Sequence, residues 1–196
     1  MQDADEAATI RDAACVVLVD HAGAEPRLLM GKRHADQVFL PSKWVFPGGR
    51  VDDADRNAGA FLDLPHWLRA FGRAAVRELA EETGIAWVGS LQPLARAITP
   101  PGRVRRFDTW FFLAETRGDP ADRSGGDGEL LDLGWFSIDA ARRLDLPNIT
   151  RLVLDDAASL LCAKEKIDPL RTPFYFYGVA GFERALIDCR ASAPPP

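Results

Sequence analysis

The sequence predicts an α/β domain in which a central mixed β-sheet is layered between helices. Segments with the pattern of strands alternate along the chain with segments with the pattern of helices, and this interleaving is typical of such domains. The 196 residues are 47% hydrophobic and 27% charged, which suits one globular domain with a substantial core. We expect residues 11–190 to form this domain, between a flexible segment at 1–10 and a disordered tail at 191–196.

Apolar, β-branched and aromatic runs predict the strands. The run AACVVLV at 13–19 reads as a buried strand, and RLLMGKR at 27–33 as the strand that returns after a turn. Further strands are expected at 87–99, 107–115 and 129–136, and the alternation of the aromatic run 174–177 suits a last strand.

Three helices are expected. One begins near Leu68 or Arg73 and ends at Thr83, before Gly84, a typical left-handed terminating residue. Its apolar residues are expected on a face different from that of its glutamates; they are Ala75, Val76 and Leu79. Ser137 is a plausible N-cap for a second helix. The third covers 148–164 and is amphipathic.

Composition argues against several functional classes. The net charge of −5 does not suit a generic binder of nucleic acids or of membrane surfaces. No apolar run reaches the length of a membrane span, and the acidic first residues lack the apolar region of a secretory signal. The three cysteines and three histidines are too far apart for a disulfide frame or a zinc site, and the cysteines suit the reduced thiols of a cytoplasmic protein.

The stretch RELAEETGI at 77–85 places three glutamates at the end of the first helix. Glu78, Glu81 and Glu82 have the i, i+3, i+4 spacing, at which like charges repel by about 0.2–0.5 kcal/mol per pair. Glu81 and Glu82 also face the negative end of the helix dipole, which costs about 0.3–1 kcal/mol each. A divalent cation would reverse both penalties, whereas the plainer interpretation is a solvated helix face.

Together with an upstream Pro-Gly-Gly, this stretch resembles the Nudix box, the loop–helix–loop signature of the Nudix hydrolases. The matching positions are Gly49, Arg77, Glu78, Leu79, Glu81, Glu82, Gly84 and Ile85. The sequence departs from that pattern twice. Asp55 stands where the family has glutamate, so Asp52 or Asp53 could take its place, and about 14 residues, near 56–70, are inserted inside the box that spans 49–85.

Within that superfamily, three stretches resemble the branch of the peroxisomal coenzyme A diphosphatases. They are RDAACVVLV, VFPGGRVDDAD and ITPPGRVRRFDTWFFLAE. Arg33 matches one of the two arginines that this branch carries upstream of its FPGG, and a clear counterpart of the second is missing.

The resemblance implies an α/β/α sandwich of the Nudix type that hydrolyses the diphosphate linkage of a nucleoside diphosphate derivative with Mg²⁺ or Mn²⁺. CoA or acyl-CoA is the first expected substrate. ADP-ribose, nucleotide sugars or dinucleoside polyphosphates are alternatives, as is a nucleotide-sensing module with little turnover. Hard carboxylate oxygens suit such a cation, which keeps several of its waters.

The resemblance also implies roles for individual residues. The expected metal ligands are Glu78, Glu81, Glu82 and Gly49, and the catalytic residues are Glu81, Glu82, Arg77 and Glu129. Arg77 would orient a glutamate, and Glu129 would be the general base, with Asp127 second. The expected substrate-binding residues are Arg33, Arg50, Arg103, Arg105 and Arg106, for which an exposed basic loop is the plainer interpretation. Gly48 and Gly49 would let the backbone turn tightly.

The insertion within the box carries much apolar surface. Its large apolar residues are Phe61, Leu62, Leu64, Trp67 and Leu68, which must be buried against the domain, a second subunit or a ligand. We interpret the segment as a short helix that lies beside the substrate cleft or at the interface of a homodimer. For His66 and Trp67, covering the core or an interface is the expected role rather than contact with substrate.

Overall fold

The structure is a computed structural model that describes residues 9–57, 63–86, 89–118, 126–163, 168 and 171–190. Its centre is one mixed β-sheet with the strand order β3-β2-β1-β6-β5-β8-β9, to which β4 adds by pairing with β1 and β7 by pairing with β2. Strand β1 lies parallel to β6, and β5 lies parallel to β8. The other pairs are antiparallel, so the expectation of a mixed sheet is confirmed.

The strands follow the apolar runs of the sequence. They are β1 Ile10–Asp20, β2 Arg27–Arg33, β3 Trp44–Val45, β4 Gly48–Arg50, β5 Gln92–Ile98, β6 Arg106–Thr116, β7 Leu130–Ser137, β8 Arg171–Gly178 and β9 Gly181–Asp188. The first begins one residue before the boundary expected at 11. Residues 1–8 and 191–196, expected to be flexible and disordered, lie outside the described residues.

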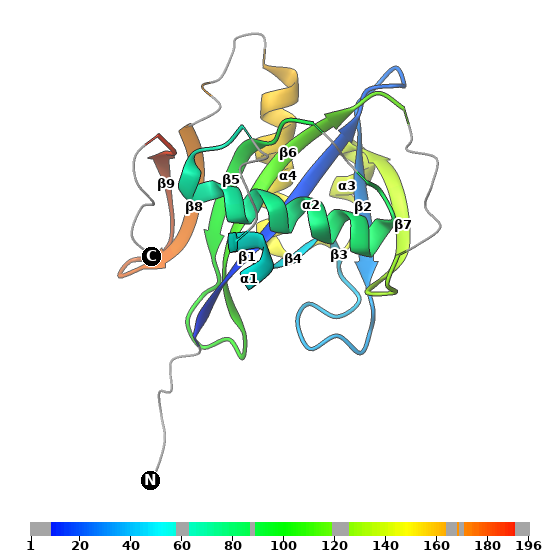
Figure 1. The fold of residues 1–196 in the computed structure, drawn as a ribbon. Coiled ribbons are helices and arrows are strands. Elements are labelled where there is room, and N and C mark those ends of the chain that lie inside the picture. The colour runs from blue at the N-terminus through cyan, green and yellow to red at the C-terminus, as the bar shows by residue number, and fades with distance from the viewer. Residues whose placement is uncertain are drawn as a thin grey trace.

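Helices cover both faces of the sheet, as Figure 1 shows. The helical elements are α1 Asp53–Asn57, the 3₁₀ turn η1 His66–Leu68, α2 Arg69–Thr83, α3 Ile138–Arg142 and α4 Asn148–Cys162. The predicted caps are present, because Gly84 ends α2 with φ of 73° and Ser137 Oγ accepts the N–H of Ala140 at 3.3 Å. No described helix is both long and apolar enough to cross a membrane.

Each face of the sheet has its own hydrophobic core. Helix α2 packs over β1 and β6, where Leu79, Trp110 and Phe112 are buried together. Helices α3 and α4 pack on the other face around Phe111, Val153 and Leu154. The structure therefore has the helix–sheet–helix layers that the sequence predicted.

Two predictions about these elements were wrong. The aromatic run 174–177 does form a strand, β8, but this is not the last one, because β9 follows after the turn Val179–Ala180 and pairs with β8 along its full length. The glutamates of α2 were expected on a face away from its apolar residues, yet Glu78 and Glu82 are buried beside Leu79. Residues 75, 78, 79 and 82 share one helix face by their spacing, so the carboxylates border the core.

The described part of the insertion packs into the domain's own core. Leu64 and Leu68 are buried under α2. The Trp67 ring contacts Trp110 edge to face, with ring centroids 5.3 Å apart. This fits the expectation that Trp67 covers the core, whereas Phe61 and Leu62 lie outside the described residues.

Candidate functional site

Three carboxylates converge where α2 passes the end of β7. Glu78 and Glu82 reach this place from α2, and Glu129 comes from the loop that precedes β7. One oxygen of each lies within 4.8 Å of the others. Helix spacing brings the first two together, whereas the third arrives only because β7 pairs with β2 at this edge of the sheet.

The Pro-Gly-Gly segment fixes the two helical carboxylates against the sheet. The Gly48 N–H donates a hydrogen bond to Glu82 Oε2 at 2.8 Å. A Cβ at Gly49 would lie 2.4 Å from the Glu78 carboxyl carbon, so the carboxylate occupies the space that any side chain there would need. These glycines lie in β4, paired with β1, and do not make the tight turn expected. Gly49 is needed because the Glu78 carboxylate lies so close to it. Gly48 is needed because its φ is 156° and a Cβ there would lie 2.3 Å from the Ala14 carbonyl oxygen of β1.

Glu82 is a buried carboxylate with one hydrogen-bonded oxygen. The residue is 1% exposed, and its Oε1 has no hydrogen-bond partner among the described residues. Burial raises the pKa of Glu82 to about 8, and although the Gly48 N–H opposes that rise, Glu129 and Glu78 add to it. Burial likewise raises the pKa of Glu78, against the opposing charge of Arg77. The interpretation as a solvated face therefore fails for both.

Arg77 donates hydrogen bonds to four residues of the box. It donates to Glu78 Oε1 at 2.9 Å and to Glu81 Oε2 at 2.8 Å, as expected for a residue that orients a glutamate. It also donates to the Arg50 carbonyl at 2.8 Å and to Asp55 Oδ2 at 3.0 Å. Asp55 is buried and paired with Arg77, and it does not belong to the cluster of Glu78, Glu82 and Glu129.

Glu81 and Asp127 lie beside the cluster rather than in it. Glu81 is exposed and points to Arg77, although its carbonyl accepts the Asp127 N–H at 2.9 Å. Asp127 Oδ1 in turn accepts the N–H of Glu129 at 2.9 Å. Asp127 therefore shapes the loop that carries Glu129.

The loop after β2 holds Glu129 in place. Gln37 Nε2 donates to Glu129 Oε1 at 3.1 Å, and Arg33 Nη2 lies 3.5 Å from the same oxygen. Arg33 also donates to the Phe39 carbonyl at 3.0 Å, which ties the loop to the strand. Sequence reasoning did not identify Gln37. In the sequence, Gln37 is marked only by its position in the polar loop before FPGG, which is a weak indication of function.

A cavity of about 350 Å³ opens next to Glu129. Its lining residues are His34, Asp36, Gln37, Val38, Arg105, Asp127, Gly128 and Glu129. Among the five arginines expected to bind substrate, Arg105 is the one that lines it. Arg33 borders it through Glu129 and Gln37, whereas Arg106 Nε is hydrogen bonded to the Thr99 carbonyl at 3.1 Å. Arg50 and Arg103 are exposed and do not line the cavity.

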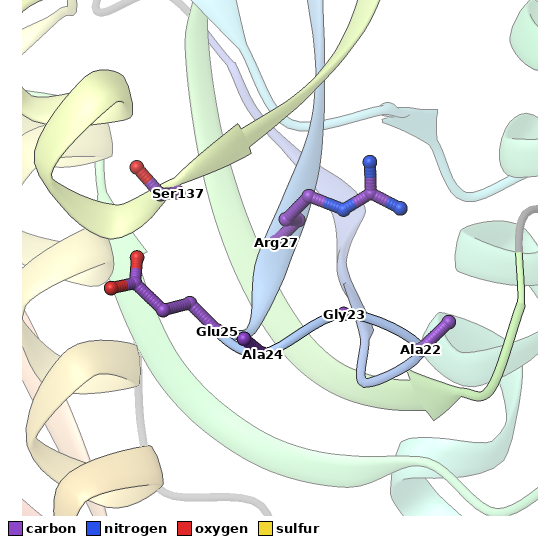
Figure 2. Close-up of a pocket in the computed structure, with 6 residues that line it drawn as sticks. All are labelled: Ala22, Gly23, Ala24, Glu25, Arg27 and Ser137. Carbon is purple, nitrogen blue, oxygen red and sulfur yellow. The ribbon is translucent and has the colours of Figure 1, made fainter.

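A larger cavity of about 550 Å³ lies elsewhere, at the turn between β1 and β2 (Figure 2). Among the described residues that line it, Glu25 and Arg27 are charged, and Arg27 already donates to Asp20 Oδ2 at 2.6 Å. This cavity lacks the convergent carboxylates, so we place the functional site at the smaller one.

The residues of the cluster fit a divalent cation. All three supply the hard oxygen ligands that Mg²⁺ and Mn²⁺ prefer. The unpartnered Glu82 Oε1 is a buried acceptor, and such an atom normally has a partner. Two buried carboxylates beside a third also carry a repulsion that a cation would offset.

Comparisons with known proteins show which proteins the chain is similar to. The NUDIX domain family model matches residues 9–157. A NUDIX hydrolase structure from Alicyclobacillus acidocaldarius is 25% identical, with a TM-score of 0.63 over 76% of this chain and 90% of that chain. The NUDIX domain of Shewanella oneidensis NrtR, solved with ADP ribose, is 14% identical, with a TM-score of 0.62 over 78% and 89% of the two chains, and shows likeness of fold alone.

A curated relative is similar over a shorter stretch. A Caenorhabditis elegans protein described as nudix hydrolase 7 is 40% identical over 75 residues, which are 38% of this chain. The match spans 22% of that relative's own length.

Proposed function

Because the chain belongs to the NUDIX domain family, we propose that it is a metal-dependent hydrolase that cleaves the diphosphate linkage of a nucleoside diphosphate derivative. The observation that carries the proposal is the convergence of Glu78, Glu82 and Glu129 around a buried carboxylate oxygen without a partner. A cation held there would offset the charge of the diphosphate oxygens and acidify a water.

The chain's own residues divide the remaining work. Glu78 and Glu82 are buried and fixed by Arg77 and Gly48, so we assign them to hold the cation. Glu129 is partly exposed at the cavity, and we assign it as the base. Its Oε1 accepts from Gln37 and Arg33, so the oxygen that takes the proton from water is Oε2.

We place the substrate phosphates in the cavity beside Glu129. Arg105 lines it, and a guanidinium offers a planar pair of donors to a phosphate group. We propose CoA or acyl-CoA as the first substrates to test, from the sequence resemblance. ADP-ribose and dinucleoside polyphosphates follow, because structural neighbours include a domain solved with ADP ribose and an Ap4A hydrolase. Nucleotide sugars complete the set.

The deciding experiment incubates the full chain with Mg²⁺ or Mn²⁺ and a panel of CoA, acetyl-CoA, ADP-ribose, a nucleotide sugar and Ap4A, and identifies the products by mass. Cleavage of a P–O–P bond supports the proposal. Tight binding of a panel member without any cleavage would establish a sensing module instead.

Two matched variants test the assignment of the glutamates. Glu82→Gln keeps the shape and an acceptor for Gly48, and we expect turnover to fall by at least about 10²-fold, because a bound cation contributes several kcal/mol. Glu81→Gln removes a carboxylate outside the cluster, and we expect a smaller loss. Equal losses in the two variants would contradict the assignment of Glu82.

A further inference from the structure

The outer edge of β9 is the feature that the proposed function does not use. This strand ends the sheet, at the side remote from β7 and the carboxylates (Figure 1). Within the described ranges, β9 pairs with β8 alone. Proteins commonly protect such an edge with a proline, a bulge or charged side chains, lysine above all. The strand GFERALID has no proline, bulge or lysine, and its charged residues are Glu183, Arg184 and Asp188.

The backbone groups of four residues face outward from this edge. Leu186 lies opposite Pro173, which has no N–H to donate. The two residues therefore form a non-hydrogen-bonded pair, in which the N–H and C=O of Leu186 point away from β8. Hydrogen-bonded and non-hydrogen-bonded pairs alternate along an antiparallel ladder, so the backbone groups of Phe182, Arg184 and Asp188 point outward as well. Among the residues that the structure describes, no strand pairs with these outward-facing backbone groups.

The side chains around this edge are unusually apolar for a surface. Of the seven large hydrophobic side chains exposed among the described residues, four belong to the β8–β9 hairpin; they are Tyr177, Val179, Phe182 and Leu186. Leu186 is 55% exposed and Phe182 is 50% exposed. An exposed apolar edge strand is a surface on which another strand can add.

We propose that β9 pairs antiparallel with β9 of a second copy of this chain, with the two-fold axis at Leu186, so that one sheet continues through a homodimer. In this register Leu186 faces its own counterpart, and Arg184 faces Asp188 of the second copy. The first is an apolar pair and the second joins opposite charges, both favourable across strands, with Asp188 also paired to Arg190 of its own chain at 3.3 Å. A two-fold interface uses the same surface on both subunits and must therefore be self-complementary. The residues from Arg184 to Asp188 meet this condition when the axis passes through Leu186.

Other registers of the same strand are poorer. An axis at Arg184 would place two guanidinium groups opposite each other, and like charges at that position are destabilising. An axis at Ala185 would place Arg184 against Leu186, and Phe182 against Asp188. Arg184 is exposed, and within its own chain its Nη2 donates to Asp156 Oδ1 at 3.4 Å and its Nε donates to the Tyr175 hydroxyl at 3.3 Å. Within the described residues, its Nη1 is the donor left for a carboxylate across the axis.

The first test measures the mass of the full chain by sedimentation or light scattering over a range of micromolar concentrations. The expected result is twice the chain mass of 21.5 kDa. Leu186→Lys places like charges on the axis, and its dissociation constant should rise about tenfold or more. Leu131→Lys, at an equally exposed position in β7, is the control and should leave the dimer intact. Circular dichroism checks that both variants are folded.

The second test locates the axis by cross-linking. In a chain with Cys162→Ser, which removes an exposed thiol, Leu186→Cys should form an intermolecular disulfide on mild oxidation. Phe182→Cys is similarly exposed but lies far from its counterpart in this register, so it should not cross-link. A wild-type monomer at every concentration overturns the proposal, as does a dimer that survives Leu186→Lys without cross-linking through residue 186. Activity is measured separately and does not enter either outcome.

Discussion

Glu82 is a carboxylate in a place that disfavours its charge, and this residue is also proposed to hold the cation. It is in the last turn of a helix and buried, and among the described residues one of its two carboxylate oxygens has no partner. Burial is the main reason that its pKa is raised to about 8, and the charges of Glu129 and Glu78 add to the rise. The structure tolerates it because Gly48 donates to the other oxygen and Arg77 holds the neighbouring Glu78. A buried carboxylate of this kind is unfavourable for folding alone, and such residues are expected at functional sites, here one that would bind a cation.

Gly49 offers a test of how closely the carboxylates are held. In Gly49→Ala the new Cβ would enter the space of the Glu78 carboxylate, at 2.4 Å from its carboxyl carbon. We expect Glu78 to be displaced and the affinity for Mn²⁺ to fall about 10–100-fold, the range known for lost supporting interactions around a metal. Isothermal titration calorimetry measures this affinity.

The matched control for that substitution is Gly23→Ala. A Cβ at Gly23 would meet nothing closer than 3.6 Å, so binding should be unchanged. Undiminished affinity in Gly49→Ala would show that Glu78 is not held where the structure places it.

At the scale of elements, Asp20 joins three segments. This buried carboxylate at the end of β1 accepts from Arg27 of β2 at 2.6 Å and from the Gly118 N–H, just beyond β6, at 2.9 Å. Burial alone would raise the pKa of Asp20, but the hydrogen bonds from Gly118, Arg27 and Ala22 outweigh it and lower the pKa.

The pH dependence of stability follows from that lowered pKa. The ionised form stabilises the fold above the ordinary value of 3.8, and this contribution is lost as pH falls through the folded pKa. Asp20→Asn should therefore reduce the free energy of unfolding at pH 7, and its deficit should shrink in acid. Urea unfolding at pH 7, 5 and 3 measures the deficit, with the exposed Asp139→Asn as control. A deficit that stays constant with pH would contradict the ionic role.

The insertion before α2 is a second case at this scale. Leu68 closes the 3₁₀ turn and is fully buried in the core between α2 and the sheet. Leu68→Ala should lower the free energy of unfolding by about 2–5 kcal/mol, the usual cost of a core cavity. Leu131→Ala, at a side chain 55% exposed, should change it by less than about 0.5 kcal/mol. Equal values for the two variants would mean that the insertion does not belong to the core.

At the scale of the whole molecule, the sheet brings distant segments to one site. Helix α2, the glycines of β4 and the loop before β7 are separated along the chain, and they meet because β4 pairs with β1 while β7 pairs with β2. A cation held by Glu78 and Glu82, where these three segments meet, should therefore stabilise the entire fold.

Thermal unfolding measures that stabilisation. Mn²⁺ at about 100 times its dissociation constant should stabilise the protein by about 2.7 kcal/mol, which raises Tm by roughly 5–10 °C in a chain of this size. EDTA should reverse the shift, and Glu82→Gln should reduce it strongly. A shift of equal size in Glu82→Gln would place the cation elsewhere.

The strand pattern, the helix caps at Gly84 and Ser137, and the layered α/β class could all be predicted from the sequence, because they depend on neighbours within a few residues. The acidic motif could also be recognised locally. Only the tertiary structure separated Glu82, which joins the cluster, from Glu81, which pairs with Arg77. It alone brought Gln37 to Glu129 and, within the described ranges, left the outer edge of β9 unpaired, since these relations depend on how strands far apart in the chain pair within one sheet.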